Sequence, residues 1–522
     1  MKYPENMKQL WIAFALLSLI LACNRTSTTG KVEKVVVIKE DTPWGEEVFT
    51  IPTFKEDIFT ITDYDAKERA ENNQVFIQAA IDACHANGGG VVLVPAGTWA
   101  TSYLDMKSNV NLHLVEGAAL SFLDDIELYN TPTFTRWEGI ECMNFHPLIY
   151  ARDAENMAVT GKGKIIGNGK KWWAHAKGTQ KGSLAKLYDQ VEANVAPEER
   201  NCLAFSPTSY LRPSLIQFIN CKNVLLDSVE IGSGPMWTVH LVYCENVVAQ
   251  NLKVITNGVN NDGIVPDASK KVLINNCFFS TGDDCIVIKS GLNEDGWRVG
   301  KASERIVIKD CKTEHGHGGV VIGSEMSGGV RNIYAYNCDF SQTQRGLRVK
   351  SMKGRGGVVE NLWFKDIRMD NIEDEAIRIN LDYGASSITP RTDSLPIFRN
   401  FHFENIKSVN SNYCVRITGS PEINIEGLTF VNLEMQGKYG IHMNNVENTT
   451  FTSAKIEVEK DMPLVIKDSQ RISFDSTTFT ANSTTMVKLV GKKNEDITFK
   501  NSNASTFEVP FEEEEKSNIS IQ

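Results

Sequence analysis

Three aspartates stand close together near the middle of the sequence. Asp262 is followed by Gly263, and Asp283 and Asp284 come 21 and 22 residues later. Hydrolysis of a glycosidic bond needs one protonated carboxyl group and a second carboxylate that activates water. Carboxylates held side by side repel one another, which raises the pKa of at least one of them and so supplies the proton. If one repeat separates Asp262 from Asp283, the cluster predicts an acid/base hydrolase.

Further along the chain come groups that would complement these carboxylates. His317 lies between two glycines, and Arg348 and Lys350 are two residues apart. On a strand, residues two apart project from the same face. Two cations side by side favour binding of an anion such as a uronate carboxylate, to which arginine offers a two-pronged donor. Each motif alone also fits a plain alternative: an aspartate turn, a loop histidine or a solvated strand face. Their order and complementary chemistry favour one site.

The elements that would position these groups form a repeat. From about residue 215 a short β-branched run, a polar turn that often contains asparagine, and another short run keep returning, at first every 23 to 25 residues. This pattern predicts an all-β parallel β-helix, in which strands of successive coils pair about 4.8 Å apart. A β-sandwich or a propeller is the alternative, but the signature motif of propeller blades is absent. The repeats begin at residues 223–226, 246–248, 271–274, 305–308, 332–334, 361–364, 400–403 and 448–451.

A solenoid needs a cap at its open end. Residues 72–84 predict an amphipathic helix, which ends before Gly88-Gly89-Gly90 and precedes a first strand at residues 91–94. This helix is expected to cap the N-terminal end. Its expected apolar face comprises Val75, Phe76, Ala79, Ala80 and Ala83.

The first residues indicate export. Lys2 and Lys8 precede an apolar run that ends at Ala22, and Cys23 follows directly. Such a run is typical of a secretory signal and short for a membrane span. The stretch 20–23 resembles a bacterial lipobox, which predicts a lipid on Cys23; an ordinary signal peptide with an incidental cysteine is the alternative. A lipoprotein anchored by this lipid alone, and facing the periplasm or the cell surface, is therefore expected.

Four segments follow from these features. Residues 1–22 are expected to be the signal peptide and residues 23–50 a tether. Residues 51–505 are expected to form the catalytic β-helix, and residues 506–522 a loose acidic tail.

Composition excludes several classes of function. The net charge of −11 argues against nucleic acid as a partner, because nucleic acid binds basic surfaces. It also opposes a polyanionic substrate, but exposed charges are screened beyond about 8 Å, so a local basic cluster can outweigh it. The ten cysteines after Cys23 fit stacked, buried thiols better than disulfides, and no His/Cys cluster has zinc spacing. No metal or other cofactor is expected.

Taken in order, the four motifs resemble glycoside hydrolase family 28, the polygalacturonases and their relatives. The hallmark order of that family is Asn-Thr-Asp, Gly-Asp-Asp, Gly-His-Gly and Arg-Ile-Lys. The resemblance covers roughly residues 55 to 450. The corresponding motifs here are 260–262, 282–284, 316–318 and 348–350, with further similarity at 61–67, 135–139, 147–150, 234–237 and 323–329.

This resemblance implies a right-handed parallel β-helix and inverting hydrolysis of α-1,4-linked galacturonic acid in pectin, a plant cell-wall polysaccharide. An inverting pair is expected to have about 6.5–9.5 Å between acid and base. The implied roles are general acid for Asp283, activation of water for Asp262 and Asp284, support of the acid for His317, carboxylate binding for Arg348 and Lys350, substrate orientation for Asn260, and an aromatic position near the same subsite for Tyr383.

The chain departs from the family pattern at two positions. Asn261 replaces the common threonine, and Val265 stands where many relatives have a second aspartate, although Asp267 is close by. Rhamnogalacturonan or substituted galacturonan therefore stays open as a substrate. A Ca²⁺-dependent pectate lyase and a non-catalytic glycan-binding β-helix are further alternatives. Residues 170–212 and 293–303 are long enough to close one end of a cleft, which favours exo action on pectic polysaccharide or oligogalacturonides.

Overall fold

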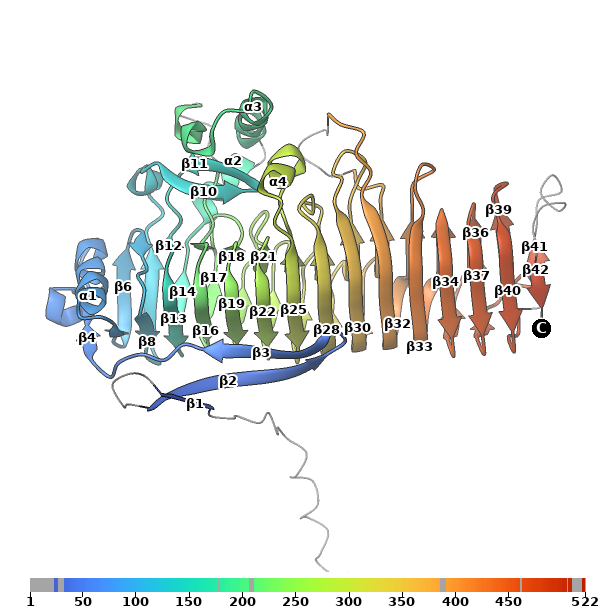
Figure 1. Ribbon diagram of the computed structural model, residues 1–522, viewed down its shortest axis with the longest axis horizontal. Helices are drawn as coiled ribbons and strands as arrows, with labels where there is room; N and C mark the ends of the chain where they lie inside the picture. Colours follow the sequence, from blue (N-terminus) through green and yellow to red (C-terminus); the bar gives the residue numbers. More distant parts are fainter. Residues whose placement is uncertain are drawn as a thin grey trace, which may run out of the picture.

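The chain forms a right-handed parallel β-helix with three rows of strands (Figure 1). The computed structural model describes residues 23–26, 32–176, 178–205, 211–384, 391–460, 462–504, 506–508 and 519–521, with side chains from Val36 onward. Strands of successive coils pair in parallel and in register, as the sequence predicts; for example, Val224 pairs with Val247, which pairs with Val272. Among the described residues, no helix is long and apolar enough to cross a membrane.

The strand rows are defined by their pairings. The row that carries the site contains β12 (Ile149–Arg152), β15 (Ile216–Ile219), β18 (Val239–Val242), β21 (Ile264–Asp267), β24 (Asp284–Ile288), β27 (Gly318–Ile322), β29 (Arg345–Lys350), β31 (Glu375–Asn380), the ends of β32 (Ile397–Thr418) and β33 (Ile425–Asn444), β36 (Leu464–Lys467) and β39 (Val487–Val490). A second row contains β8 (Val110–Leu114), β13 (Glu155–Gly161), β16 (Lys222–Asp227), β19 (Glu245–Gln250), β22 (Lys270–Asn275), β25 (Ser303–Lys309), β28 (Val330–Ser341), β30 (Val358–Asp370), β34 (Val446–Thr452), β37 (Gln470–Asp475) and β40 (Glu495–Lys500). The third row includes β9 (Ala118–Phe122), β14 (Lys164–Ile166), β17 (Glu230–Gly232), β20 (Lys253–Ile255), β23 (Phe278–Ser280) and β26 (Lys312–Glu314).

Asparagines make one corner of the coil. Asn223 and Asn246 lie just inside successive strands with φ of 52° and 56°, a left-handed conformation that asparagine tolerates better than most residues. Their side chains also bind one another along the stack: Nδ2 of Asn246 donates to Oδ1 of Asn223 at 3.0 Å, and Asn223 donates to Asn156 at 2.9 Å. The recurring asparagine in the sequence is therefore a corner residue that links neighbouring coils.

The capping helix is confirmed as α1 (Gln74–Ala86), which covers the N-terminal end of the coil (Figure 1). Its expected apolar face is right for Ala80, which is buried, and for Phe76, which packs against the core, but not for the rest. The buried side chains are Ile77, Ala80, Ile81 and Cys84, whereas Val75 is 63% exposed. The helix is rotated relative to the expectation because Ile77, Ile81 and Cys84 form a stripe that fills the end of the core better than the small alanines.

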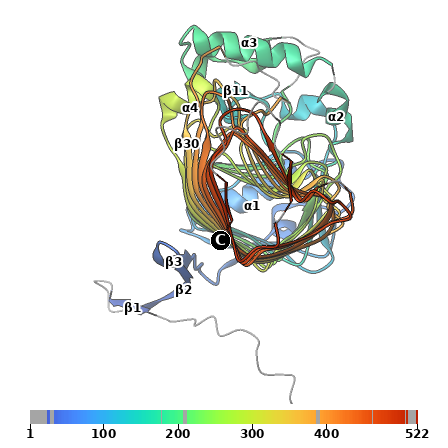
Figure 2. The same ribbon diagram turned by 90° about the vertical axis from the view of Figure 1, so that its right-hand side faces the viewer.

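The tether expected for residues 23–50 is wrong. From Val32 the chain forms an antiparallel hairpin of β2 (Val32–Thr42) and β3 (Gly45–Ile51), and β1 (Cys23–Thr26) pairs with β2. The hairpin lies along the outside of the coil (Figure 2). Phe49 is fully buried there against outward-facing apolar side chains of the second strand row, and Lys309 binds Glu40 at 2.7 Å. The hairpin binds to an apolar stripe on the outside of the coils. Short repeats in a sequence do not reveal such a stripe. The stripe is formed by Ala158, Leu225, Val248, Leu273 and Val307.

The loose tail is also wrong for the parts that the structure describes. Phe507–Glu508 (β41) pairs with β39, and Ile519–Ile521 (β42) pairs with β40, so both continue the coil. The signal segment 1–22 and Glu512–Glu515 lie outside the described residues. The ten cysteines from Cys84 to Cys414 are free and buried, as predicted.

Replacement of Phe49 by alanine should release the hairpin from the coil. Loss of a fully buried phenylalanine costs about 3–5 kcal/mol, so hydrogen exchange at the amides of residues 45–51 should accelerate greatly while activity persists. Hydrogen-exchange mass spectrometry measures this. Val75→Ala, a truncation at an exposed position, is the matched control. Unchanged exchange in the Phe49 variant would mean that the hairpin does not depend on this contact.

Candidate active site

Successive coils bring the three aspartates together. Asp262 lies two residues before β21 and Asp284 begins β24, and these strands pair through Ile264 and Ile286. One oxygen from each of Asp262, Asp283 and Asp284 lies within 4.8 Å of the other two. The predicted cluster is therefore confirmed. The nearest oxygens are closer than 6.5–9.5 Å, but that expected separation refers to whole carboxyl groups and stays a prediction.

A buried asparagine fixes the segment that carries Asp262. Asn261 accepts the backbone N–H of Gly258 at 3.0 Å and donates to the carbonyls of Gly234 and Met236 at 3.1 and 2.9 Å. Its amide therefore joins two coils, a role that needs both a donor and an acceptor. Asn260, with φ of 54°, lies at the rim of the site and donates to Oδ2 of Asp283 at 3.4 Å. Asn261, which stands where the family commonly has threonine, thus keeps polar hydrogen bonds to the backbone beneath the cluster.

Asp283 is paired with His317. Oδ1 of Asp283 lies 3.0 Å from Nδ1 of His317 and accepts the backbone N–H of Asp284 at 2.9 Å. Burial favours protonation of Asp283, but the hydrogen bond and charge of His317 outweigh it and hold the pKa of Asp283 below its ordinary value. In the same way the hydrogen bond to Asp283 raises the pKa of His317. The predicted support of Asp283 by His317 is present in the geometry.

Of the three aspartates, Asp262 is the one whose pKa is raised, so it is the one that favours the protonated form. Its side chain is buried, and burial, followed by the negative charge of Asp283, raises its pKa well above the ordinary value. The ammonium of Lys289, 3.9 Å away, opposes this shift only in part. These shifts favour protonation of Asp262 over Asp283, whereas the family pattern makes Asp283 the donor.

Asp284 completes the cluster with one oxygen bound and one available. Its Oδ2 accepts Nζ of Lys350 at 2.7 Å. Its Oδ1 is buried and has no hydrogen-bond partner among the described residues. An unpartnered carboxylate oxygen beside a protonated carboxyl group can hold and orient a water molecule.

The predicted cations project from one face of β29. The guanidinium of Arg348 and the ammonium of Lys350 lie 5.5 and 5.3 Å from the ring centre of Tyr383. Burial lowers the pKa of Arg348, and its Nε has no hydrogen-bond partner among the described residues. An arriving carboxylate would offset this burial of positive charge.

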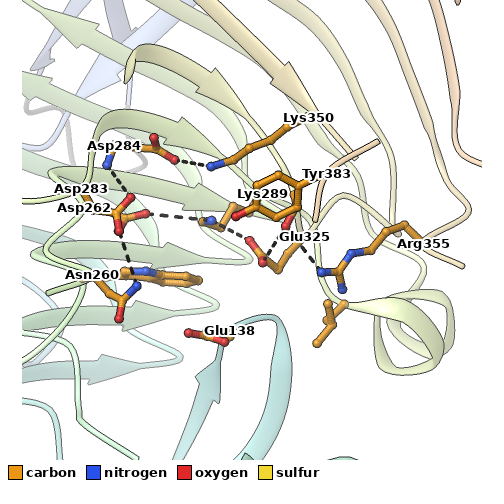
Figure 3. A pocket seen from close by; sticks show the side chains of 13 residues that line it. Glu138, Asn260, Asp262, Asp283, Asp284, Lys289, Glu325, Lys350, Arg355 and Tyr383 are labelled. Atoms are coloured by element: carbon orange, nitrogen blue, oxygen red, sulfur yellow. Dashed lines mark hydrogen bonds and ion pairs between the residues drawn. The ribbon is translucent and has the colours of Figure 1, made fainter. Parts of the chain in front are cut away.

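The cavity beside the cluster is lined by groups that the sequence analysis missed (Figure 3). Lys289 binds Glu325 at 2.6 Å and lies 4.7 Å from the ring centre of Trp237. Burial raises the pKa of Glu138 to about 7, and the charge of Glu325 adds to it. Burial would also raise the pKa of Glu325, but Lys289 and Arg355 lower it to about 2. Glu138, Trp237 and Glu325 lie in motifs singled out above, whereas no motif marks Lys289 or Arg355.

Comparison with known proteins identifies this arrangement. The model of glycosyl hydrolases family 28 matches residues 206–456. The structure of an exopolygalacturonase from Thermotoga maritima is 36% identical, with a TM-score of 0.69, over 76% of this chain and 89% of that one. The chain belongs to glycosyl hydrolases family 28. It is also 29% identical to an exo-poly-α-D-galacturonosidase of Dickeya chrysanthemi, over 78% of this chain and 72% of that protein. A family 28 exopolygalacturonase from Yersinia enterocolitica shares the fold, with a TM-score of 0.65 and 24% identity over 90% of this chain and 84% of that one.

In this family 28 glycoside hydrolase, helices and a hairpin lie over the coils around the cluster. They are β10 (Thr133–Trp137), β11 (Ile140–Asn144), α2 (Lys170–Ala176), α3 (Gln180–Glu192) and α4 (Asn293–Val299) (Figure 1). Tyr188 on α3 donates to Glu294 on α4 at 2.5 Å, and Asn293 donates to Tyr188 at 3.0 Å. The turn of the hairpin carries Glu138 into the cavity (Figure 3). The stretches 170–212 and 293–303 therefore contribute to a wall, as the sequence suggested, together with a hairpin that it did not.

The departure at Val265 is accommodated by apolar packing. Val265 is fully buried in a cluster that includes Trp237, Val287 and Leu292. Asp267 does not replace the missing aspartate, because its two oxygens bind Arg136 at 3.0 Å and His240 at 3.2 Å in a separate buried network. The family 28 site thus has an apolar side at this position.

The Asp283–His317 pair predicts the direction of a titration. With Asp283 present, His317 should titrate above its ordinary pKa of 6.5. The pair's contribution to stability is then complete below that value and lost as pH rises through the raised pKa. In Asp283→Asn the pKa of His317 should fall, because burial then dominates. NMR titration of labelled histidines measures this, with His402, whose pKa burial lowers, as the internal control. An unaltered His317 curve in the variant would contradict the pairing.

Proposed function

We propose that the enzyme hydrolyses α-1,4-linked galacturonic acid in pectic polysaccharide or oligogalacturonides, from one end of the chain. The observation that carries this proposal is the placement of cations beside the carboxylate cluster. Arg348 and Lys350 lie two coils beyond Asp284, yet Lys350 reaches that carboxylate and both cations face Tyr383. A uronate carboxylate there would leave its glycosidic oxygen near Asp283. Relatives whose names specify polygalacturonase activity support the same substrate class.

The mechanism uses one proton in the cluster. Transfer of the proton from Asp262 to Asp283 makes Asp283 the acid and Asp262 a base. Asp283 then protonates the glycosidic oxygen as its bond to the anomeric carbon breaks. Water held by Oδ1 of Asp284 and by Asp262 attacks that carbon and gives its proton to Asp262. One water is consumed and the cluster returns to its starting protonation. The inverting outcome follows from family membership rather than from the carboxylate spacing.

Exo action is supported by the wall. The β10–β11 hairpin, α3 and α4 lie over the coils around the cluster, and Glu138 from the hairpin and Leu292 next to α4 line the cavity. A polysaccharide that ends in this cavity would present its terminal linkage to Asp283. Two lysines argue against a Ca²⁺-dependent lyase. Lys350 and Lys289 lie 2.7 and 3.9 Å from the carboxylates and would repel a divalent cation.

Asp283→Asn should lower kcat on oligogalacturonides by at least about 100-fold, because it removes the general acid, while the substrate still binds. Reducing-end assays with product sizing measure the rate, and calorimetry measures binding. The wild type should release a single short product and no unsaturated, ultraviolet-absorbing end. Asp82→Asn on the exposed face of α1 is the matched control. A variant at position 283 with full activity would disprove the assignment of the acid, and an unsaturated product would disprove hydrolysis.

We further propose that the enzyme is exported and anchored by a lipid on Cys23. The basic start, the apolar run and the lipobox-like residues 20–23 support this. Cys23→Ser should move the protein from the membrane fraction to the soluble fraction and abolish labelling by a fatty-acid analogue. Retention of both in the variant would exclude this anchor. Cys84→Ser, at a buried core position, is the control.

A further inference from the structure

The outward face of the site's strand row stays basic for several coils beyond the catalytic cluster. The strand register aligns Val321 with Arg348, Arg348 with Arg378, Arg378 with Arg416, and Arg416 with His442. These residues therefore form a ladder with one rung per coil, on β29, β31, β32 and β33. Of the basic residues in this ladder, only Arg348 belongs to the family motif at residues 348–350.

The positive charge of this ladder is only partly neutralised. The buried Glu375 is shared among Arg345 at 2.9 Å, Arg416 at 3.5 Å and Arg378 at 3.7 Å. Asp382 also binds Arg378, at 3.1 Å. Even so, burial outweighs both carboxylates and lowers the pKa of Arg378 to about 10. The side chain of Arg416 is 44% exposed, so its guanidinium can reach a ligand. Asp374 binds Arg345 at 3.0 Å. Three carboxylates therefore serve the four arginines of these coils, which are Arg345, Arg348, Arg378 and Arg416, and the excess positive charge can bind an added anion.

Aromatic rings lie next to the ladder. Tyr413 and Tyr439 stack at 4.7 Å on adjacent coils, and the guanidinium of Arg416 lies 5.1 Å from the ring centre of Tyr413. Both rings are partly exposed. Partly exposed tyrosine faces pack well against the apolar side of a pyranose, while the adjacent cations bind its carboxylate.

The wall determines which part of the substrate can lie there. The β10–β11 hairpin lies over coils on the N-terminal side of the cluster, and α4 lies over the coil between β24 and β25, whereas β31 to β33 follow on the C-terminal side (Figure 1). If the chain end enters the cavity at Glu138, the rest of the polysaccharide must run toward β33. Coils are about 4.8 Å apart, close to the length of one sugar unit, so successive carboxylates can meet successive rungs.

We propose that Arg378, Arg416, His442, Tyr413 and Tyr439 form an anion-binding track for the leaving portion of an acidic polysaccharide. This inference rests on the proposed function and extends it from the cleaved linkage to the chain beyond. The track makes the enzyme select polymers and longer oligomers over the dimer, through carboxylates that take no part in the chemistry.

The test compares chain lengths in variants at the exposed rung. In the wild type, kcat/KM should rise from digalacturonate to hexagalacturonate, and added salt should reduce the rise. In Arg416→Ala the hexamer-to-dimer ratio of kcat/KM should fall roughly two- to fivefold, the range for one exposed ion pair. Arg416→Lys should restore part of the ratio. Arg471→Ala, which removes an exposed arginine from β37 in a different strand row, should leave the ratio unchanged.

Binding to the inactive Asp283→Asn enzyme separates the two proposals. Calorimetry with the dimer and the hexamer should show tighter hexamer binding, which Arg416→Ala in that background weakens. An equal loss for both lengths, or an unchanged ratio in a variant with wild-type melting temperature, would overturn the track. If Arg416→Ala melts early, Arg416→Gln replaces it in the same comparison. A wild type that cleaves no oligogalacturonide would instead refute the proposed function.

Discussion

Registered stacking of parallel coils is the constraint on which the site depends. Neighbouring coils are about 4.8 Å apart, so side chains at matched positions must lie close together whatever their charge. This places Asp262 beside Asp284 and aligns Arg348 with Arg378. Like charges at this spacing are unfavourable unless the protein compensates them. The enzyme compensates the carboxylates with Lys289 and Lys350, and it compensates the arginines only in part.

The same spacing shifts the pKa values of the carboxyl groups in the cluster. Burial and the negative charge of Asp283 raise the pKa of Asp262, whereas His317 lowers the pKa of Asp283. The pKa values of two carboxyl groups are thus shifted in opposite directions, although their nearest oxygens lie within 4.8 Å of each other. Such a difference between neighbouring groups is what an acid/base pair requires.

The sequence predicted what is repeated and what is local. Asparagine corners and β-branched runs recur at coil spacing, so residue types and their spacing were enough to infer the fold and the grouping of Asp262, Asp283 and His317. Contacts between distant segments could not be inferred in this way. Lys289 lies at the end of an ordinary strand and becomes part of the site only because Glu325 comes beside it on the next coil. The sequence predicts a tether where the β2–β3 hairpin lies, because the apolar stripe that binds Phe49 is spread over five coils with one residue in each.

Local charge placement resolves the apparent conflict between a net charge of −11 and an anionic substrate. A polysaccharide in the groove feels the charges within roughly one Debye length, about 8 Å at physiological salt, far more than the sum over the chain. The nearest cations are Arg348, Lys350 and the basic residues that follow them on β31 and β32. Their acidic partners already form ion pairs with them. Because the β10–β11 hairpin lies over the coils on the other side of the cluster, these cations favour binding of the polymer toward the C-terminal coils. Fold, charge and closure therefore favour the same orientation of the polymer, with its end in the cavity and its length over the basic coils.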